Sequence, residues 1–333
     1  MNKRKPRILT GDRPTGPLHL GHFVGTLQNR VKLQDKYDCF FIIADLHTLT
    51  TAPTKDKTST INDRARGLVL DYLSVGIDPD KSVIYQQSQV PEVTYLSLIF
   101  TNLISVPRAQ RVPTLKEVMH DLRIQKPSLG LLNYPVLQSA DILMVKANLV
   151  PVGKDQEQHV EFARMIAKKF NKKFGETFCI PKALISKNGA RIMSLQDPKK
   201  KMSKTGSAKG CIDLFEKPGI IRKKIMSAVT DTDNKIVFRP NKKNGISNLL
   251  TIYSLISDRE IKDIEKQFEN KKYSEFKKSL GDELVKKLKP FRENREKLLS
   301  REVYIEEILK NGEEKARRIA QSTMRDVKEK MGF

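Results

Sequence analysis

The chain has 333 residues, of which 38% are apolar, enough for a large core and for two domains. Its net charge of +23 favours a polyanionic partner such as a nucleic acid. No apolar run is long enough for a membrane span, no apolar signal-peptide core follows the basic N-terminus, and the three cysteines form no CxxC metal pair and suit a reducing cytoplasm.

Short apolar runs alternate with helical patterns through the first part of the chain. Strands buried on both faces are predicted at 8–9, 39–44 and 82–85, a further strand at 149–152, and helices at 22–33 and 57–75. This alternation predicts right-handed βαβ units around a parallel sheet, with ligands beyond the carboxyl ends of the strands. Asp45 and His47 follow one predicted strand and are therefore expected at the rim of a pocket.

A turn rich in glycine and histidine follows the first predicted strand. Its sequence is Pro14-Thr15-Gly16-Pro17-Leu18-His19-Leu20-Gly21-His22. Gly11 and Gly16 allow a sharp turn, and the helix that follows offers N–H groups to a phosphate. His19 and His22 share one face of that helix and can bind a phosphoryl group as its geometry changes. The alternative is a capped surface helix with incidental histidines.

The middle of the chain changes character. Residues 106–130 are basic and interrupted by prolines, which indicates an insertion between the sheet halves, at a subunit contact. A helix is expected from Tyr134 through Val145, with Pro135 in its first turn. Another, amphipathic helix is predicted over residues 155–171.

A lysine-rich segment, Lys199-Lys200-Lys201-Met202-Ser203-Lys204-Thr205, lies farther along the chain. Charge runs of this kind are usually solvated surface. Here a strand-like run over 191–195 precedes the lysines and Gly206-Ser207 follows as a hinge, which predicts a mobile lysine loop over 199–206. Ammonium groups on flexible stems suit a departing pyrophosphate. Beyond residue 207 the chain is predicted to be almost wholly helical, with a boundary near 217–219.

Together and in this order, the histidine turn and the lysine loop resemble the two signatures of class I aminoacyl-tRNA synthetases. Thr205 replaces the usual final Ser of the second signature and keeps its hydroxyl. Further stretches resemble bacterial tryptophanyl-tRNA synthetases, so that the similarity spans nearly the whole chain. These stretches are 10–16, 44–47, 134–143, 150–159, 189–195 and 245–253.

The resemblance implies an α/β fold with a Rossmann-like parallel-sheet catalytic domain over 1–206 and an all-helical anticodon-binding domain over 207–333. It implies ATP-dependent attachment of tryptophan to tRNA(Trp) through a tryptophanyl-adenylate, with release of pyrophosphate and AMP. Mg²⁺ would be carried by ATP, with no protein metal site. A homodimer in the cytoplasm, with one tRNA crossing both subunits, is also implied.

The resemblance also assigns the site residues. Asp141 would accept the indole N–H, and Tyr134 and Gln156 would hold the α-amino group. His47 would pack near the indole, in a slot lined by Leu9, Ile142, Val150 and Val152. The expected ATP contacts are Arg13, Pro14, Thr15, Gly21, His22, Gly153, Lys154, Asp155, Ile192, Lys201, Met202, Ser203, Lys204 and Thr205. Catalysis would depend on His19, His22, Lys201 and Lys204.

Two departures from the family pattern leave alternatives open. Gln138 stands where a Met often faces the indole, and Lys154 replaces a Glu beside the adenosine. Gln138 favours a tyrosyl-tRNA synthetase, but residues 152–156 lack the Gly-Gly-x-Asp-Gln-like signature of that enzyme. A non-catalytic RNA-binding paralogue would have lost the histidines or loop lysines, and a nucleotidylyltransferase would lack the helical C-terminal part.

Overall fold

A five-stranded parallel sheet forms the centre of the computed structural model, in the order β3-β2-β1-β4-β5. The strands are β1 (Arg7–Asp12), β2 (Asp38–Ile43), β3 (Ser82–Gln86), β4 (Leu149–Val152) and β5 (Lys182–Ile185). The structure describes residues 5–51, 54–121, 124–185, 191–203 and 208–333, apart from the side chains at 57, 121 and 155. The predicted parallel α/β fold is confirmed, and its strand order reverses between β1 and β4, where such sheets bind ligands.

Four of the five strands lie where the sequence predicts them, because their apolar runs are buried. In β2, every residue from Cys39 to Ile43 is buried. The sequence gives no comparable signal for β5, whose four residues are all partly or fully exposed at the sheet edge. Gly11 was expected to allow a turn but lies inside β1, where an added Cβ would stand 1.8 Å from the carbonyl oxygen of Ile42. That glycine is required by close packing of β1 on β2.

The helices around the sheet agree with the predicted βαβ pattern. The segment after the histidine turn is continuous through α1 (Leu20–His22), the π-helical η1 (Phe23–Leu27) and α2 (Gln28–Leu33). Between β2 and β3 lie α3 (Leu46–Leu49), α4 (Lys55–Thr58) and α5 (Ile61–Ser74). Between β4 and β5 lie the 3₁₀ turn η3 (Lys154–Gln156) and α10 (Glu157–Phe174).

The region between β3 and β4 is helical throughout much of its length. It contains the 3₁₀ turn η2 (Gln87–Gln89), α6 (Glu92–Thr101), α7 (Val106–Gln110), α8 (Pro113–Asp121) and α9 (Leu129–Met144). Helix α9 begins five residues earlier than predicted from Tyr134, so Pro135 lies inside it. The Ser128 side chain caps the helix by accepting from the N–H of Leu131, and this cap sets the start.

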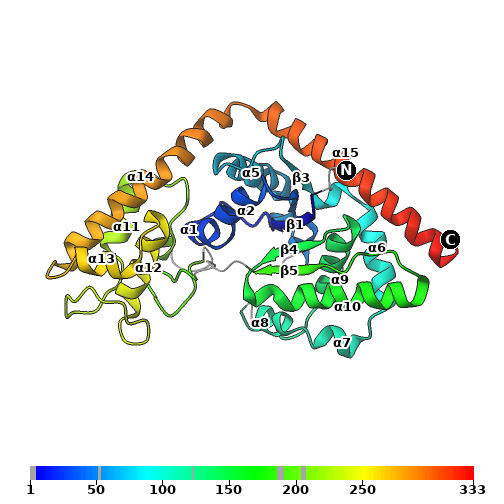
Figure 1. The fold of residues 1–333 in the computed structure, drawn as a ribbon, viewed down its shortest axis with the longest axis horizontal. Coiled ribbons are helices and arrows are strands. Elements are labelled where there is room, and N and C mark those ends of the chain that lie inside the picture. The colour runs from blue at the N-terminus through cyan, green and yellow to red at the C-terminus, as the bar shows by residue number, and fades with distance from the viewer. Residues whose placement is uncertain (1–4, 52–53, 122–123, 186–190, 204–207) are drawn as a thin grey trace.

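The C-terminal part is mostly helical and returns to the sheet. After η4 (Ala208–Gly210) come α11 (Pro218–Met226), α12 (Asn244–Ser257), α13 (Ile261–Gln267), α14 (Tyr273–Leu299) and α15 (Glu302–Met331). In Figure 1, α14 rises from the lobe formed by α11–α13, and α15 descends across the other lobe. Helix α15 packs on β3, α6 and α9, and Gly312 lies so close to β3 that an added Cβ would be 1.8 Å from the carbonyl oxygen of Ile84.

Candidate active site

A cavity of about 470 Å³ opens at the carboxyl ends of β1 and β4, on the side of the sheet where the strand order reverses. All eight residues expected to bind tryptophan line it: Leu9, His47, Tyr134, Asp141, Ile142, Val150, Val152 and Gln156. These residues come from β1, β4, α3, α9 and η3, so the fold gathers side chains that are up to 147 residues apart in sequence. The structure therefore brings these eight residues together in one cavity.

Asp141 is the buried acceptor in the cavity wall. Its Oδ2 lies 2.9 Å from His47 Nε2, and Gln87 Nε2 donates to its two oxygens at 2.8 and 2.9 Å. The amide of Gln87 is oriented in turn, because its Oε1 accepts from the N–H of Leu46. A carboxylate can accept about four hydrogen bonds, so this arrangement leaves capacity for one donor from a ligand.

Burial raises the pKa of Asp141, while the hydrogen bonds from His47 and Gln87 act in the opposite direction. The neighbouring Tyr85 hydroxyl has its pKa raised by burial and by the negative charge of Asp141. His47 and Gln87 therefore favour the ionised form of Asp141.

A second polar group, away from Asp141, also lines the cavity. The hydroxyls of Thr114 and Tyr134 lie 2.6 Å apart, and Tyr134 Oη lies 3.1 Å from His159 Nε2. His159 Nδ1 is 2.8 Å from Gln156 Oε1, and Thr114 also bonds to Nε2 of His159. The two residues expected to bind the α-amino group are thus joined through one buried histidine.

An ion pair at the end of β1 lines part of the cavity. Arg30 Nη1 donates to Asp12 Oδ2 at 2.5 Å, and the Tyr72 hydroxyl donates to the same oxygen at 2.6 Å. Burial alone would raise the pKa of Asp12, but the charge and hydrogen bonds of Arg30 lower it to about 2. Arg30 Nη2 also donates to the carbonyl of Gly11 at 3.2 Å. The pair therefore fixes the strand end from which the histidine turn departs.

Hydrogen bonds define the tautomer of both histidine rings in the histidine turn. His19 caps α1, with its Nδ1 accepting from the N–H of Gly21 at 3.1 Å, and His22 Nδ1 accepts from the N–H of His19 at 3.1 Å. Because each Nδ1 accepts, the proton of each neutral ring is on Nε2, which is a donor suited to phosphate oxygens. The rings lie 3.7 Å apart between centroids. A Cβ on Gly21 would stand 2.9 Å from the His19 ring, so Gly21 makes room for that imidazole.

The lysine loop begins in an irregular segment where the sequence predicts a strand-like run over 191–195. Met193 forms only an isolated antiparallel bridge with Lys201. The side-chain amide of Asn248 occupies both the N–H and the carbonyl of Met193, each at 2.9 Å, so the ladder cannot extend there. Lys204 and Thr205, with the predicted hinge at 206–207, lie outside the described residues.

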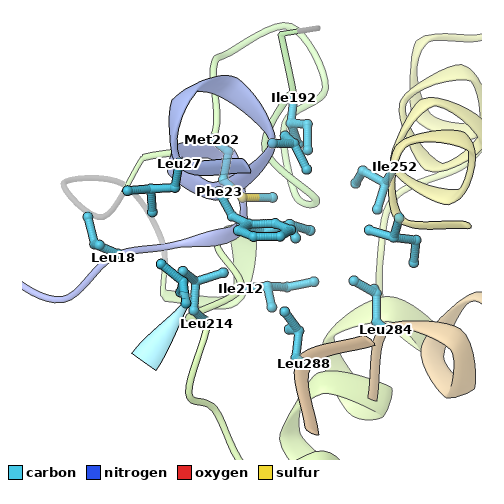
Figure 2. Packing of buried hydrophobic residues seen from close by; sticks show 14 of the residues in the cluster. Leu18, Phe23, Leu27, Ile192, Met202, Ile212, Leu214, Ile252, Leu284 and Leu288 are labelled. Carbon is cyan, nitrogen blue, oxygen red and sulfur yellow. The ribbon is translucent and has the colours of Figure 1, made fainter. Parts of the chain in front are cut away.

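The two signatures share one apolar core. Figure 2 shows Phe23 and Leu27 of the first signature helix beside Met202 of the lysine segment. Ile192 and Met202 are each 2% exposed, so their side chains belong to this core. The same cluster includes Ile252, Leu284 and Leu288 of α12 and α14, which ties the lysine segment to the helical part of the chain.

The residues expected to contact ATP are spread over the cavity edge and its surroundings. Arg13 and Gly153 line the cavity, whereas His19, His22 and the described loop residues 191–203 are not among its lining residues. Lys154 and Lys201 are exposed, and the side chain of Asp155 lies outside the described ones. The departure at Gln138 does line the cavity.

Sequence reasoning missed Gln87, Thr114, His159 and Asn248. Gln87 follows directly after β3, so the strand-end rule that selected Asp45 and His47 could also have found it. His159 lies in a stretch that resembles the family but received no role. Asn248 also lies in such a stretch, whereas nothing local distinguishes Thr114, because its partners lie 20 or more residues away.

Two further properties concern the described residues. None of the helices in the described ranges has the length and apolar character needed to cross a membrane. Within the same ranges, no group of three or more His, Cys, Asp or Glu side chains is arranged to hold a metal ion.

Comparisons with known proteins define the class. A family model described as "tRNA synthetases class I (W and Y)" matches residues 1–289, and the chain belongs to that family. It is 44% identical to the tryptophan–tRNA ligase of Chlamydia caviae, with 98% of this chain and 95% of the relative covered.

Solved structures give the same result. The tryptophanyl-tRNA synthetase of Mycoplasma pneumoniae has a TM-score of 0.86 at 30% identity, with 99% of this chain and 98% of that chain covered. That of Campylobacter jejuni, complexed with ADP and tryptophan, has a TM-score of 0.82 at 34% identity, covering 98% and 100%. The family resemblance found in the sequence is therefore confirmed.

Proposed function

We infer that this protein is an ATP-dependent tryptophan–tRNA ligase, which forms a tryptophanyl-adenylate and then transfers tryptophan to tRNA(Trp). The observation that carries this inference is the buried Asp141 acceptor in a cavity with apolar walls, beside a second polar wall suited to an ammonium group. The curated relatives are tryptophan ligases, which favours tryptophan over the tyrosine alternative.

We propose that the amino acid lies with its indole N–H toward Asp141 and its α-ammonium toward Tyr134 and Gln156. The apolar slot between these ends is formed by Leu9, Ile142, Val150 and Val152. A buried N–H needs an acceptor, so an aromatic substrate that places its polar atom elsewhere leaves Asp141 without its partner. This geometry supports discrimination against tyrosine.

In the activation step, the tryptophan carboxylate oxygen bonds to the α-phosphorus of ATP as the bond to pyrophosphate breaks. His19 and His22 offer Nε2–H donors to the reacting phosphate, and Lys201 and Lys204 are assigned to the leaving group. When bound with ATP, Mg²⁺ would add positive charge at the phosphates. In the second step the terminal ribose hydroxyl of the tRNA bonds to the tryptophan carbonyl carbon and AMP leaves.

The quaternary state and the tRNA contacts complete the proposal. Exposed apolar side chains on α6, α7 and α9, namely Leu98, Val106 and Leu129, support a homodimer whose interface includes these helices. The net charge of +23 supports tRNA binding, with residues 207–333 proposed as the anticodon-binding part and 1–206 as the catalytic part. The cytoplasm remains the proposed location.

The deciding experiment is ATP–pyrophosphate exchange with each of the twenty amino acids. Exchange that requires tryptophan and is orders of magnitude weaker with tyrosine is expected. Asp141→Ala should abolish most of that preference, whereas His120→Phe, at an exposed residue outside the cavity lining, should leave the preference unchanged. Comparable exchange with tyrosine in the unaltered protein would overturn the proposal.

A further inference from the structure

Three helices meet at the polar wall of the cavity, and the residue at their junction is His159. Thr114 comes from α8, Tyr134 from α9 and His159 from α10, and all three line the cavity. Thr114 is 6% and His159 5% exposed, so the group is largely withdrawn from water. Buried polar groups need satisfied hydrogen bonds, and the bonds within this group join Thr114, Tyr134 and His159 to one another and His159 to Gln156.

The hydrogen-bond directions in this group follow from its chemistry. An amide oxygen can only accept, so the bond of 2.8 Å between His159 Nδ1 and Gln156 Oε1 places the imidazole proton on Nδ1. In the neutral ring, Nε2 then carries a lone pair and must accept from a hydroxyl. Thr114 and Tyr134 are the hydroxyls within reach of it.

These directions determine which atoms face a ligand. With the Thr114 hydrogen on Nε2, Tyr134 donates to Thr114 Oγ1, and the phenolic oxygen keeps its lone pairs for the cavity. At the same time, the Nδ1–H bond holds the oxygen of Gln156 in a fixed place, and a carbonyl oxygen has two lone pairs and can accept from more than one donor. Without the acceptor at Nε2, the chain of hydroxyls could reverse and point the Tyr134 hydrogen at the ligand.

We propose that His159 is a positioning residue that orients both oxygen acceptors, Tyr134 Oη and Gln156 Oε1, toward the α-ammonium of the amino acid. This inference rests on the proposed function, in which those two residues hold the α-amino group. An ammonium group is a donor with no acceptor, so its recognition requires lone pairs on every protein atom that it meets. The neutral imidazole of His159 orients two such atoms toward the ammonium and keeps the hydroxyl hydrogen of Tyr134 turned away from it.

The competing interpretation is that His159 only packs α10 against α8 and α9. The edge-to-face contact between the Tyr134 and His159 rings, with centroids 5.5 Å apart, would serve packing in either case. The two interpretations differ in one respect. A packing role affects every ligand of the cavity alike, whereas an orienting role affects only ligands that carry the ammonium.

The test compares tryptophan with 3-indolepropionate, which has the same indole and carboxylate but no amino group, and with tryptamine, which keeps the ammonium. The chain contains no tryptophan, so the fluorescence of each ligand reports its own binding. His159→Phe removes both ring nitrogens at similar volume. It should weaken tryptophan and tryptamine about 10- to 100-fold, as loss of a hydrogen bond to a charged group would. Binding of 3-indolepropionate should change less than about twofold.

Matched variants keep the result decisive. His159→Asn retains a donor for Gln156 but lacks Nε2, and Thr114→Val removes one hydroxyl, so each should give an intermediate, ammonium-selective loss. These two carry the test if circular dichroism shows that His159→Phe does not fold. His120→Phe, an exposed histidine on α8 outside the cavity lining, should leave all three affinities unchanged.

The possible outcomes distinguish failure of the positioning role of His159 from failure of the proposed function. Equal losses for tryptophan and 3-indolepropionate in the His159 and Thr114 variants would reduce His159 to a packing residue and overturn the inference, with the proposed function intact. If the unaltered protein does not bind tryptophan, or binds 3-indolepropionate as tightly, the proposed ammonium site itself fails.

Discussion

The side-chain amide of Asn248 makes two hydrogen bonds of 2.9 Å with the backbone of Met193, accepting from its N–H and donating to its carbonyl. Asn248 belongs to α12 and is 6% exposed, whereas Met193 precedes the lysine loop. This pair therefore fastens the base of the loop to the helical part of the chain. Met193 also forms the bridge with Lys201, so the anchor is one residue pair away from a proposed catalytic lysine.

Replacing Asn248 with Leu should slow adenylate formation more than it weakens substrate binding. Both backbone groups of Met193 would lose a buried partner, at a cost of about 1–3 kcal/mol each. The loop would then spend less time in place, and single-turnover adenylate formation should fall at least about tenfold. The tryptophan affinity should stay within about twofold. Asn248→Asp keeps one acceptor, so its rate of adenylate formation should lie between those of the unaltered protein and Asn248→Leu. Equal losses in rate and in tryptophan affinity would show that the hydrogen bonds of Asn248 support the whole cavity and not the loop alone.

Tryptophan affinity should fall as the pH is lowered. The fall should begin at a higher pH than it would if Asp141 had the pKa of an exposed aspartate. Burial raises the pKa of Asp141, and only the ionised carboxylate accepts from both its partners and the indole N–H. The stability of the ligand-free fold should depend on pH in the opposite direction. Because the pKa of Asp141 is raised in the folded protein, its contribution to stability is present at low pH and is lost as pH rises through the folded pKa. Ligand fluorescence titrations from neutral to acidic pH measure the effect.

The control for that pH dependence is Asp141→Asn, whose affinity should be lower and nearly independent of pH. Gln87→Leu removes a donor that lowers the Asp141 pKa, so the loss of affinity should begin at a still higher pH. A Gln87→Leu profile that coincides with that of the unaltered protein would contradict the assigned role of Gln87.

The ion pair between Arg30 and Asp12 should contribute strongly to the free energy of unfolding. Arg30→Met leaves Asp12 without its cation and should lower the free energy of unfolding by about 3–5 kcal/mol. Tyr72→Phe removes one hydrogen bond to the same carboxylate and should cost about 1 kcal/mol. Since the pKa of Asp12 is lowered to about 2, its contribution is present above the usual aspartate pKa and lost as pH falls through about 2. Urea denaturation at neutral pH should show that Arg30→Met destabilises the protein more than Tyr72→Phe does. The reverse order would contradict this prediction.

The part of the fold that follows local pattern could be predicted from the sequence. Buried strands are recognised in the sequence as apolar runs, and the alternation of these runs with segments of helical spacing predicts a parallel sheet. The end of a strand at a known edge then locates His47. The start of α9 was placed wrongly because Pro135 gave a stronger local signal than the Ser128 cap, although both are compatible with a helix.

What could not be predicted depends on contacts between distant residues. Gly11 and Gly312 are both required by an opposing carbonyl oxygen, from Ile42 and Ile84, and no feature of either local sequence reveals that neighbour. The partners of His159 come from two other helices, so its role appears only when α8, α9 and α10 are placed together. Side chains that orient other side chains leave no periodic pattern in a sequence.

Two glycine substitutions should have opposite effects on stability. Gly312→Ala in α15 would place a Cβ 1.8 Å from the Ile84 carbonyl oxygen, so α15 must move away from β3, at a cost of about 2–4 kcal/mol. Gly67→Ala in α5 meets no atom within 4 Å and should stabilise by about 0.5–1 kcal/mol, because alanine favours a helix. Thermal melting of both variants tests the packing of α15 on the sheet, and equal melting temperatures would contradict it.

The loop lysines should differ in their effects although they carry the same charge. Lys201 pairs with Met193 at the loop base, whereas its neighbour Lys200 forms an ion pair with Asp197 at 3.3 Å and has a side chain that is 81% exposed. Negative charge on the leaving group appears mainly in the transition state, so Lys201→Ala should slow single-turnover adenylate formation at least about tenfold while tryptophan affinity stays nearly constant. Lys200→Ala removes the same charge one residue away and should change the rate by less than about twofold. If the two variants slow the reaction equally, the lysines act only through the general positive field of the loop, and the assignment of Lys201 to the leaving group is wrong.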